Sequence, residues 1–233
     1  MRLDKLLGNM GYGTRSEIKK YCKQGLVFVN DKEVKKSDVH VNPGQDKIVF
    51  NDIEVVYREF IYLMMNKPSG VVSATFDKYD DTVIDLIDLE YRTFEPFPVG
   101  RLDKDTEGLL VLTNDGQLAH RILSPKKHVP KKYYVEVDGE ITEHDVEKFK
   151  EGVDIGEEKL TKPAVLEPNG DTAFVTITEG KFHQIKRMFE QVGKKVTYLK
   201  RVKMGNLELD EDLELGEYRE LTKEEIEKLE EIR

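Results

Sequence analysis

Cysteine and long apolar runs are nearly missing from this chain of 233 residues. Its one cysteine is Cys22, so no disulfide can form within the chain. No stretch approaches the roughly 18 consecutive apolar residues of a membrane-spanning helix. The first residues, Met1–Lys5, also lack the apolar core of a secretory signal. We therefore expect a cytoplasmic globular protein, and the 38% hydrophobic content is enough to build a buried core.

The sequence signatures of several large enzyme classes are absent as well. There is no GxxxxGK[ST] phosphate loop, no dinucleotide-binding glycine pattern and no GxSxG nucleophile elbow. The histidines are scattered and form no zinc-ligand spacing with the cysteine: His40, His120, His128, His144 and His183. These absences argue against a nucleotide hydrolase, a dehydrogenase, a serine hydrolase of that type and a zinc enzyme.

Charge is present in excess, but it is distributed unevenly along the chain. The net charge of −9 comes mostly from residues 206–233, which hold twelve acids and four bases. Residues 181–205 carry eight bases and one acid, residues 121–132 carry five bases and no acid, and residues 1–36 carry nine bases and four acids. Three basic segments on a nearly neutral body favour binding to a polyanion, although each segment alone also fits a solvated surface.

The first 56 residues predict two short helices followed by strands. Apolar residues recur at helical spacing between Leu3 and Met10, and Thr14 with Glu17 forms a capping box that starts a second helix ending at Gly25. An alternating strand follows at 26–30, and residues 47–50 and 53–56 flank a hairpin turn at 51–52.

This N-terminal pattern resembles an S4 domain. The resemblance rests on Arg2-Leu3-Asp4-Lys5-Leu6-Leu7, Thr14-Arg15-Ser16 and Gly25-x-Val27-x-Val29-Asn30. S4 domains bind structured RNA through the basic faces of two small helices. The resemblance therefore implies RNA contacts by Arg2, Arg15, Lys19, Lys20 and Lys23. The alternative is a two-helix cap on a small sheet that binds no RNA.

The rest of the chain predicts an α+β body with mixed, mostly antiparallel strands. Apolar and alternating runs predict strands at 61–65, 71–74, 109–112, 131–137, 160–166, 173–178 and 196–203. Helices are expected at 82–89, 117–123, 145–152 and 185–192, and a capping box of Thr222 and Glu225 starts a last, acidic helix.

The most distinctive stretch is Gly100–Leu110, which places three carboxylates and an arginine on a glycine-flanked loop. Alternating carboxylates at Asp103, Asp105 and Glu107 fit a divalent-cation loop, but Arg101 and Lys104 crowd that loop with positive charge. A single carboxylate acting as nucleophile or base is the second interpretation, and a capped turn without chemistry is the third.

Residues 61 to about 222 resemble the pseudouridine synthases of the RsuA type. Four motifs in order carry the resemblance: Asn66-Lys67-Pro68-x-Gly70, Gly100-Arg101-Leu102-Asp103-x-x-Thr106-x-Gly108-Leu109, Lys131-x-Tyr133-x-Val135, and Glu179-Gly180-x-x-His183-Gln184-x-Lys186-Arg187-Met188-Phe189. An S4 domain joined to this body is also the layout of that family. The resemblance implies an S4-like domain at 1–58 and a catalytic domain at 59–233.

The resemblance also implies roles for individual residues. Asp103 takes the place of the catalytic aspartate, Tyr133 that of the active-site tyrosine, and Lys186 that of the basic partner. Asp105 and Glu107 fall outside these positions and are expected to be structural. Further RNA contacts are implied for Lys67, Arg101, Lys131, His183, Gln184 and Arg187. Pseudouridylation breaks the N1–C1′ bond, rotates the uracil and rejoins it through C5, so neither a cofactor nor a metal is expected.

The RNA target is inferred only from resemblance. The segment 160–167, LTKPAVLE, looks more like the enzyme of the small ribosomal subunit than its large-subunit relatives. This favours uridine 516 of 16S rRNA, free or in a partly assembled subunit, acted on by a monomer. A large-subunit (23S) rRNA synthase and a non-catalytic S4-type ribosome-assembly factor remain alternatives.

Overall fold

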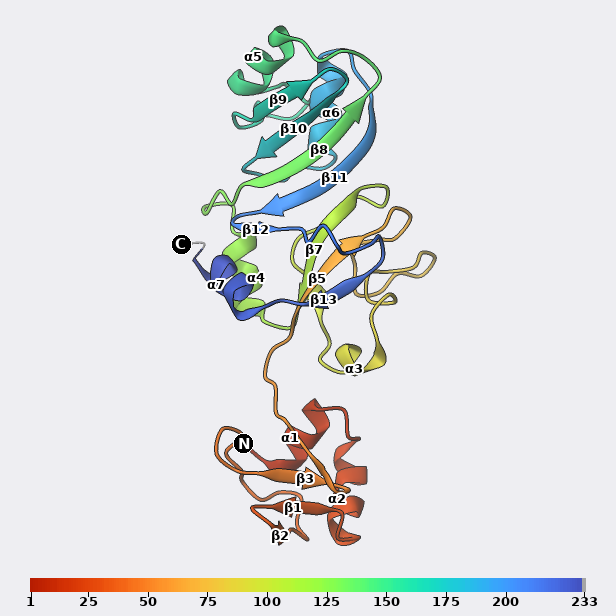
Figure 1. The fold of residues 1–233 in the computed structure, drawn as a ribbon, viewed down its shortest axis with the longest axis vertical. Coiled ribbons are helices and arrows are strands. Elements are labelled where there is room, and N and C mark those ends of the chain that lie inside the picture. Colours follow the sequence, from red (N-terminus) through yellow and green to blue (C-terminus); the bar gives the residue numbers. More distant parts are fainter. Residues whose placement is uncertain (232–233) are drawn as a thin grey trace. The chain divides into compact units, whose positions relative to one another are not determined.

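The computed structural model describes residues 1–231, and their contacts separate into two compact units (Figure 1). The N-terminal unit contains Met1–Ile61 and Asp88–Glu95. The C-terminal unit contains Tyr62–Ile87 and the chain from Pro96 onward. The domain boundary near residue 58 stays a prediction.

The N-terminal unit combines two helices with a four-stranded antiparallel sheet of order β2-β1-β3-β4. Its elements are α1 (Leu3–Asn9), α2 (Arg15–Lys23), β1 (Val27–Val29), β2 (Lys32–Glu33), β3 (Ile48–Phe50) and β4 (Ile53–Glu54), and α3 (Leu89–Arg92) is grouped with it. Its core joins apolar side chains of both helices to the sheet, including Leu3, Leu6, Leu7, Ile18, Val27 and Ile48. Burial of this shared apolar surface stabilises helices that are too short to be stable alone.

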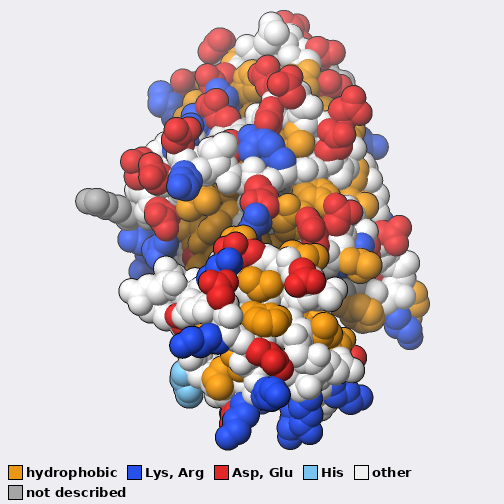
Figure 2. Space-filling model, turned by 60° about the horizontal axis from the view of Figure 1, so that its bottom comes forward, with side chains coloured by type: hydrophobic (Ala, Val, Ile, Leu, Met, Phe, Trp, Pro, Cys, Tyr) orange, Lys and Arg blue, Asp and Glu red, His pale blue; other side chains and the backbone are white. Residues whose placement is uncertain are grey.

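Helix α2 begins and ends as its sequence predicts. The Thr14 side chain accepts a bond from Glu17 N while the Glu17 carboxylate accepts one from Thr14 N, which completes the capping box. Gly25 follows the helix with φ +78°, a conformation that glycine adopts without strain. The exposed residues of this helix include four cations: Arg15, Lys19, Lys20 and Lys23. Figure 2 shows Lys and Arg side chains gathered along the lower rim, over the N-terminal unit.

The C-terminal unit is built on a nine-stranded mixed sheet of order β13-β5-β7-β11-β8-β10-β9, with β12 paired to β11 and β6 paired to β7. The strands are β5 (Tyr62–Lys67), β6 (Phe97–Pro98), β7 (Glu107–Thr113), β8 (Lys131–Val137), β9 (Val165–Asn169), β10 (Thr172–Ile177), β11 (Val196–Met204), β12 (Leu207–Glu208) and β13 (Tyr218–Glu220). Their pairings are antiparallel except between β7 and β11, which run parallel.

Four helices accompany this sheet: α4 (Gly116–Leu123), α5 (Glu143–Glu151), α6 (Gln184–Gln191) and α7 (Lys223–Glu230). Apolar side chains of α4 and α7 pack against β5 and β7 in one core, which includes Met64, Leu109, Val111, Leu118, Ile122 and Leu229. Helix α6 buries Ile185, Met188 and Phe189, and the Phe189 ring contacts Phe149 of α5 at a centroid distance of 4.9 Å. No helix within residues 1–231 is both long enough and apolar enough to span a membrane.

The predicted α+β class and the mostly antiparallel sheet are confirmed, but three local predictions are wrong. Residues 71–74 form only an isolated bridge, Val72 to Thr82, because β5 runs on through Lys67 and the chain then turns away. Residues 83–86 are turns: Asp85 accepts bonds from the backbone and hydroxyl of Thr82, as in the first turn of a helix, but no helix follows, and α3 begins only at Leu89. Residues 160–164 are not a strand, and β9 begins only at Val165, after Pro163.

Candidate active site

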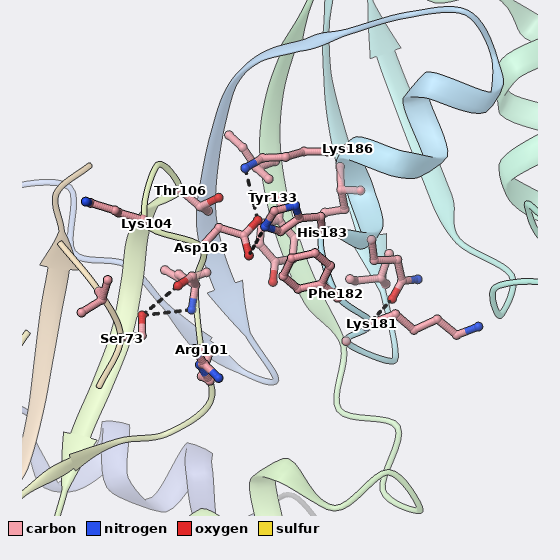
Figure 3. A pocket seen from close by; sticks show the side chains of 17 residues that line it. Ser73, Arg101, Asp103, Lys104, Thr106, Tyr133, Lys181, Phe182, His183 and Lys186 are labelled. Atoms are coloured by element: carbon pink, nitrogen blue, oxygen red, sulfur yellow. Dashed lines mark hydrogen bonds and ion pairs between the residues drawn. The ribbon is translucent and has the colours of Figure 1, made fainter. Parts of the chain in front are cut away.

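A cavity of about 460 Å³ opens in the C-terminal unit, and three distant segments of the sequence line it (Figure 3). The first is the loop 101–106, which precedes β7. The second is Tyr133 on β8, and the third is the segment 180–186, which enters α6. The cavity therefore contains the three predicted catalytic residues and several of the predicted RNA contacts.

Strand pairing brings the loop and the tyrosine together. Arg201 on β11 is the register partner of Gly108 on β7 and also of Tyr133 on β8, so the three residues lie in one row across the sheet. Gly108 has φ +101°, and a Cβ atom added there would lie 2.2 Å from the backbone oxygen of Arg201. Only glycine fits this close approach. The glycine thus lets the loop that carries Asp103 enter the sheet in the same row as Tyr133, with only β11 between them.

The loop backbone is held in place by the segment that follows β5. The Ser73 hydroxyl bonds both Leu102 N (3.1 Å) and Leu102 O (3.0 Å), and Gly70 N donates to Lys104 O at 2.8 Å. The Lys67 ammonium donates to the carbonyl oxygens of Thr106 (2.9 Å) and Lys104 (3.3 Å), and also to Pro68 O. The motif Asn66–Gly70 and the nearby Ser73 therefore hold the backbone of the loop in place.

Lys67 is completely buried by this arrangement. Burial lowers its pKa to about 8, against the opposing effect of the negative charges of Asp105, Glu107 and Asp103. The structure gives no support to the predicted RNA contact of Lys67, because its ammonium is enclosed and three backbone carbonyls use its donors.

At the centre of the cavity one lysine holds two carboxylates. Lys186 Nζ lies 3.2 Å from Asp103 Oδ2 and 2.5 Å from Asp105 Oδ1. His183 Nε2 lies 3.7 Å from the other oxygen of Asp103. The Asp103 carboxyl is about one-quarter exposed, whereas that of Asp105 is mostly in solvent, with 27% and 70% of their surfaces accessible. Asp103 is thus the carboxylate that faces the cavity interior, between two basic groups (Figure 3).

The charges of this group shift one resolved pKa. Burial raises the pKa of Asp105, but the hydrogen bond and charge of Lys186 outweigh burial and hold it below its ordinary value. Asp105 is therefore ionised at neutral pH, and Lys186 is shared between two anions rather than given to one.

A second ion cluster fixes the start of α6. Arg187 Nη1 donates to Glu157 Oε1 at 2.9 Å and to Phe182 O at 3.0 Å, while its other nitrogen bonds Ile155 O. Lys181 Nζ also lies 3.2 Å from Glu157. Those two cations hold the pKa of Glu157 below its ordinary value. Lys181 and Arg187 are thus both paired with one carboxylate of the protein itself, which offsets one of their two positive charges.

Within residues 1–231, no group of three or more His, Cys, Asp and Glu side chains is arranged to hold a metal ion. Glu107 instead accepts a hydrogen bond from the Tyr198 hydroxyl at 2.7 Å.

Comparison with known proteins assigns the chain to a family. Residues 61–191 match the RNA pseudouridylate synthase family, and residues 1–47 match the S4 domain. An uncharacterised RNA pseudouridine synthase of Bacillus subtilis, YtzG, is 54% identical over 231 residues, with 97% of each chain covered. The chain belongs to the RNA pseudouridine synthase family.

Further relatives agree with that assignment. The ribosomal small subunit pseudouridine synthase A of Haemophilus influenzae is 43% identical to this synthase, over 98% of this chain and 99% of that one. A crystal structure of a pseudouridylate synthase superposes with a TM-score of 0.70 and 42% identity, over 98% of this chain and 99% of that chain. The protein is thus an isomerase that modifies RNA and carries an S4 RNA-binding domain.

The structure separates the predicted RNA contacts of the synthase unit by accessibility. Arg101 is exposed at the cavity, and His183 is half-buried beside Asp103. Gln184 is buried: its amide donates to Glu179 and its oxygen accepts from Lys181 N, so it orders the segment instead of facing solvent. Lys131 is half-buried with its ammonium on Val129 O, and burial lowers its pKa to about 8.

Three features of the site escaped the sequence analysis. Asp105 was expected to be structural only, yet it shares Lys186 with Asp103. Thr106 lines the cavity, and its buried hydroxyl has no hydrogen-bond partner among the described residues. Phe182 lines the cavity with 72% of its surface exposed. Thr106 and Asp105 had a signal in the sequence, as a position of the second motif and as one of its alternating carboxylates, whereas Phe182 had none.

Proposed function

We propose that this synthase converts uridine 516 of 16S rRNA to pseudouridine, with Asp103 as the catalytic carboxylate. The observation that carries the proposal is the position of Asp103, whose carboxylate faces the cavity within 3.2 Å of Lys186 and 3.7 Å of His183. The small-subunit target draws its support from relatives such as the ribosomal small subunit pseudouridine synthases A of Haemophilus influenzae and Vibrio cholerae, which are 43% and 42% identical.

The residues present suit each demand of the reaction. The target uridine leaves its stack to enter the cavity, which costs a few kcal/mol. The buried ring of Tyr133 supplies a stacking surface there, worth roughly 1–3 kcal/mol per base. Asp103 acts on the ribose while the N1–C1′ bond breaks, either by attack on C1′ or by taking the C2′ proton. Lys186 balances the negative charge that moves between the carboxylate and the uracil.

Selection of the RNA depends on a different set of residues. The exposed cations of α2 and Arg2 bind phosphates of folded RNA, and Arg101 contacts the strand at the cavity. Most of the phosphate contacts are therefore assigned to the N-terminal unit, and the chemistry to the C-terminal unit, where Arg101 adds a contact at the cavity. The substrate is 16S rRNA, free or in a partly assembled subunit.

Asp103→Asn tests the catalytic assignment. We expect its single-turnover rate on 16S rRNA to fall by about 10²–10⁴-fold with RNA affinity nearly unchanged, since the amide keeps the shape but not the charge. Asp105→Asn is the matched control, because it removes the neighbouring carboxylate and should leave most of the activity. Full activity in Asp103→Asn would contradict the proposal.

Mapping pseudouridine in rRNA from cells that lack this protein tests the target. Loss of the modification at uridine 516 alone is expected. Loss at a 23S position instead would identify a large-subunit synthase, and an unchanged rRNA would favour a role in assembly without catalysis on rRNA.

A further inference from the structure

Phe182 is an apolar ring at the mouth of a polar cavity. It lines the cavity, yet 72% of its surface is exposed, whereas Tyr133 in the same cavity is only 7% exposed. Single exposed apolar residues are common and by themselves mean little. The surroundings of Phe182 distinguish it from such a residue, because its exposed ring is held rigidly.

One face of the Phe182 ring is covered by the imidazole of His183. The ring centroids are 3.8 Å apart and the planes differ by 19°, a stacked pair. His183 adopts a left-handed conformation, φ 49° and ψ 33°, which is uncommon outside glycine and accumulates at functional sites. The backbone oxygen of Phe182 is also bonded by Arg187 Nη1 at 3.0 Å. The aromatic pair is therefore fixed before any RNA arrives.

This pair is placed directly beside the reacting group. The His183 ring stacks on Phe182 and also faces Asp103, with its Nε2 atom 3.7 Å from Asp103 Oδ1 (Figure 3). Tyr133 is buried and serves the base that enters the cavity, so the exposed Phe182 ring is left for a neighbouring base that stays outside.

The charges around Phe182 argue against a phosphate as its neighbour. Lys181 and Arg187 flank the ring in sequence, but Glu157 pairs with both of them, at 3.2 and 2.9 Å. Both cations at this rim are thus already engaged in an ion pair and are largely buried, with 21% and 26% of their side-chain surfaces exposed, so neither extends toward a phosphate. What remains accessible is an aromatic surface, and every nucleobase offers a π face to such a surface.

We propose that Phe182, supported by His183, is a stacking platform for an unpaired base that flanks the target uridine. This inference rests on the proposed function of the cavity and extends it to the class of substrate. A base inside a duplex has no free face at that point, so the platform selects uridines whose neighbour is also unpaired. The selection is for single-stranded context and is tolerant of base identity.

Substitution of Phe182 tests the platform directly. With a 16S rRNA fragment that contains the target, Phe182→Ala should weaken binding by about 5- to 150-fold, the loss expected for one stacked base. Phe182→Trp should bind at least as well as the parent. Phe76→Ala is the matched control, since Phe76 is 80% exposed in the same unit but does not line the cavity. An equal loss in both alanine variants would overturn the proposal.

Abasic substitutions in the RNA then identify the stacked base. Removing the base that stacks on Phe182 should weaken binding to the parent by the same factor as Phe182→Ala, and the two changes together should cause no further loss. Independent, multiplicative losses at every flanking position would refute the platform. Placing 2-aminopurine at the sensitive position should give fluorescence quenching with the parent and not with Phe182→Ala.

These readouts are independent of catalysis. A protein that binds the fragment without isomerising uridine 516 would sink the proposed function, while the abasic series still decides whether Phe182 stacks. A fragment in which the flanking base is paired should bind the parent and Phe182→Ala with equal, weaker affinity. If Phe182→Ala lost more affinity for the paired fragment than for the unpaired one, the proposed selection of unpaired neighbours would be contradicted.

Discussion

The cations of α2 and those of the cavity are held in opposite ways. In the described chain, Arg15, Lys19, Lys20 and Lys23 are exposed and form no ion pair. In the cavity, Lys186 is shared by Asp103 and Asp105; Arg187, which follows it on α6, is bonded to Glu157 and two carbonyls. The first group can pair with RNA phosphates at little cost, whereas the second is already committed to the protein. This difference separates binding from chemistry.

The largest effect is expected from the lysine that two carboxylates share. Lys186→Met should lower the single-turnover rate by about 10²–10³-fold, because it removes the positive charge facing the reacting carboxylate. Affinity for the same rRNA fragment should change by less than about threefold, because this ammonium is bound to Asp103 and Asp105. Quenched time courses of pseudouridine formation at saturating enzyme give the single-turnover rate, and a binding assay gives the RNA affinity separately.

Lys186→Arg provides the control for that prediction. The guanidinium keeps the charge and reaches both carboxylates, so most of the rate should return. A Lys186→Met variant that binds RNA poorly but reacts at the parent rate would contradict this assignment, since Lys186 would then act in RNA binding like the α2 cations.

A smaller effect is expected from the buried lysine beneath the loop. Lys67→Met should lower the free energy of unfolding by about 1–3 kcal/mol, because the carbonyls of Pro68, Lys104 and Thr106 lose their buried donor. Urea denaturation measures this loss. RNA affinity of the folded variant should stay at the parent value.

Lys104→Met is the matched control for stability. The Lys104 ammonium is half-exposed and pairs with Asp80 at 2.6 Å, a surface interaction worth about 0–1 kcal/mol. A stable Lys67→Met variant with weakened RNA binding would restore the prediction made from sequence, that this lysine contacts RNA.

Lys67 also shows where sequence reasoning stops. The resemblance implied an RNA contact for it, and nothing local distinguishes a lysine that points outward from one enclosed by carbonyls 37 and 39 residues further along the chain. The α2 helix was predictable because its cap and its stop are local signals, Thr14 with Glu17 and then Gly25.

The cavity likewise has parts that local motifs predict and parts that only tertiary packing determines. Asp103, Tyr133 and Lys186 each stood in a recognisable motif, so their meeting in one cavity was expected from the resemblance. The bond between Lys186 and Asp105 depends on how α6 faces the loop, which is set by tertiary packing. The failed helix at 82–89 shows the same limit, since Thr82 donates to Asp85 as at a helix start, yet the chain does not continue as a helix.

Substitutions on α2 are expected to have the smallest effect per residue, and they should change RNA affinity but not the reaction rate. Lys19→Gln combined with Lys20→Gln should reduce the slope of log affinity against log salt by roughly 0.7–0.9 for each phosphate contact removed. The single-turnover rate at saturating RNA should not change, because neither lysine lines the cavity. Filter binding from low to moderate salt measures the slope.

Lys148→Gln combined with Lys150→Gln is the matched control, because these are two exposed lysines on a helix of the C-terminal unit. Their removal changes the net charge equally, so an equal change in slope would mean that the effect is general attraction to a polyanion. A change in slope in the α2 variant alone would locate the phosphate contacts on that helix. A fall in the single-turnover rate at saturating RNA in the α2 variant would contradict the separation of binding from chemistry, since the same cations would then serve both.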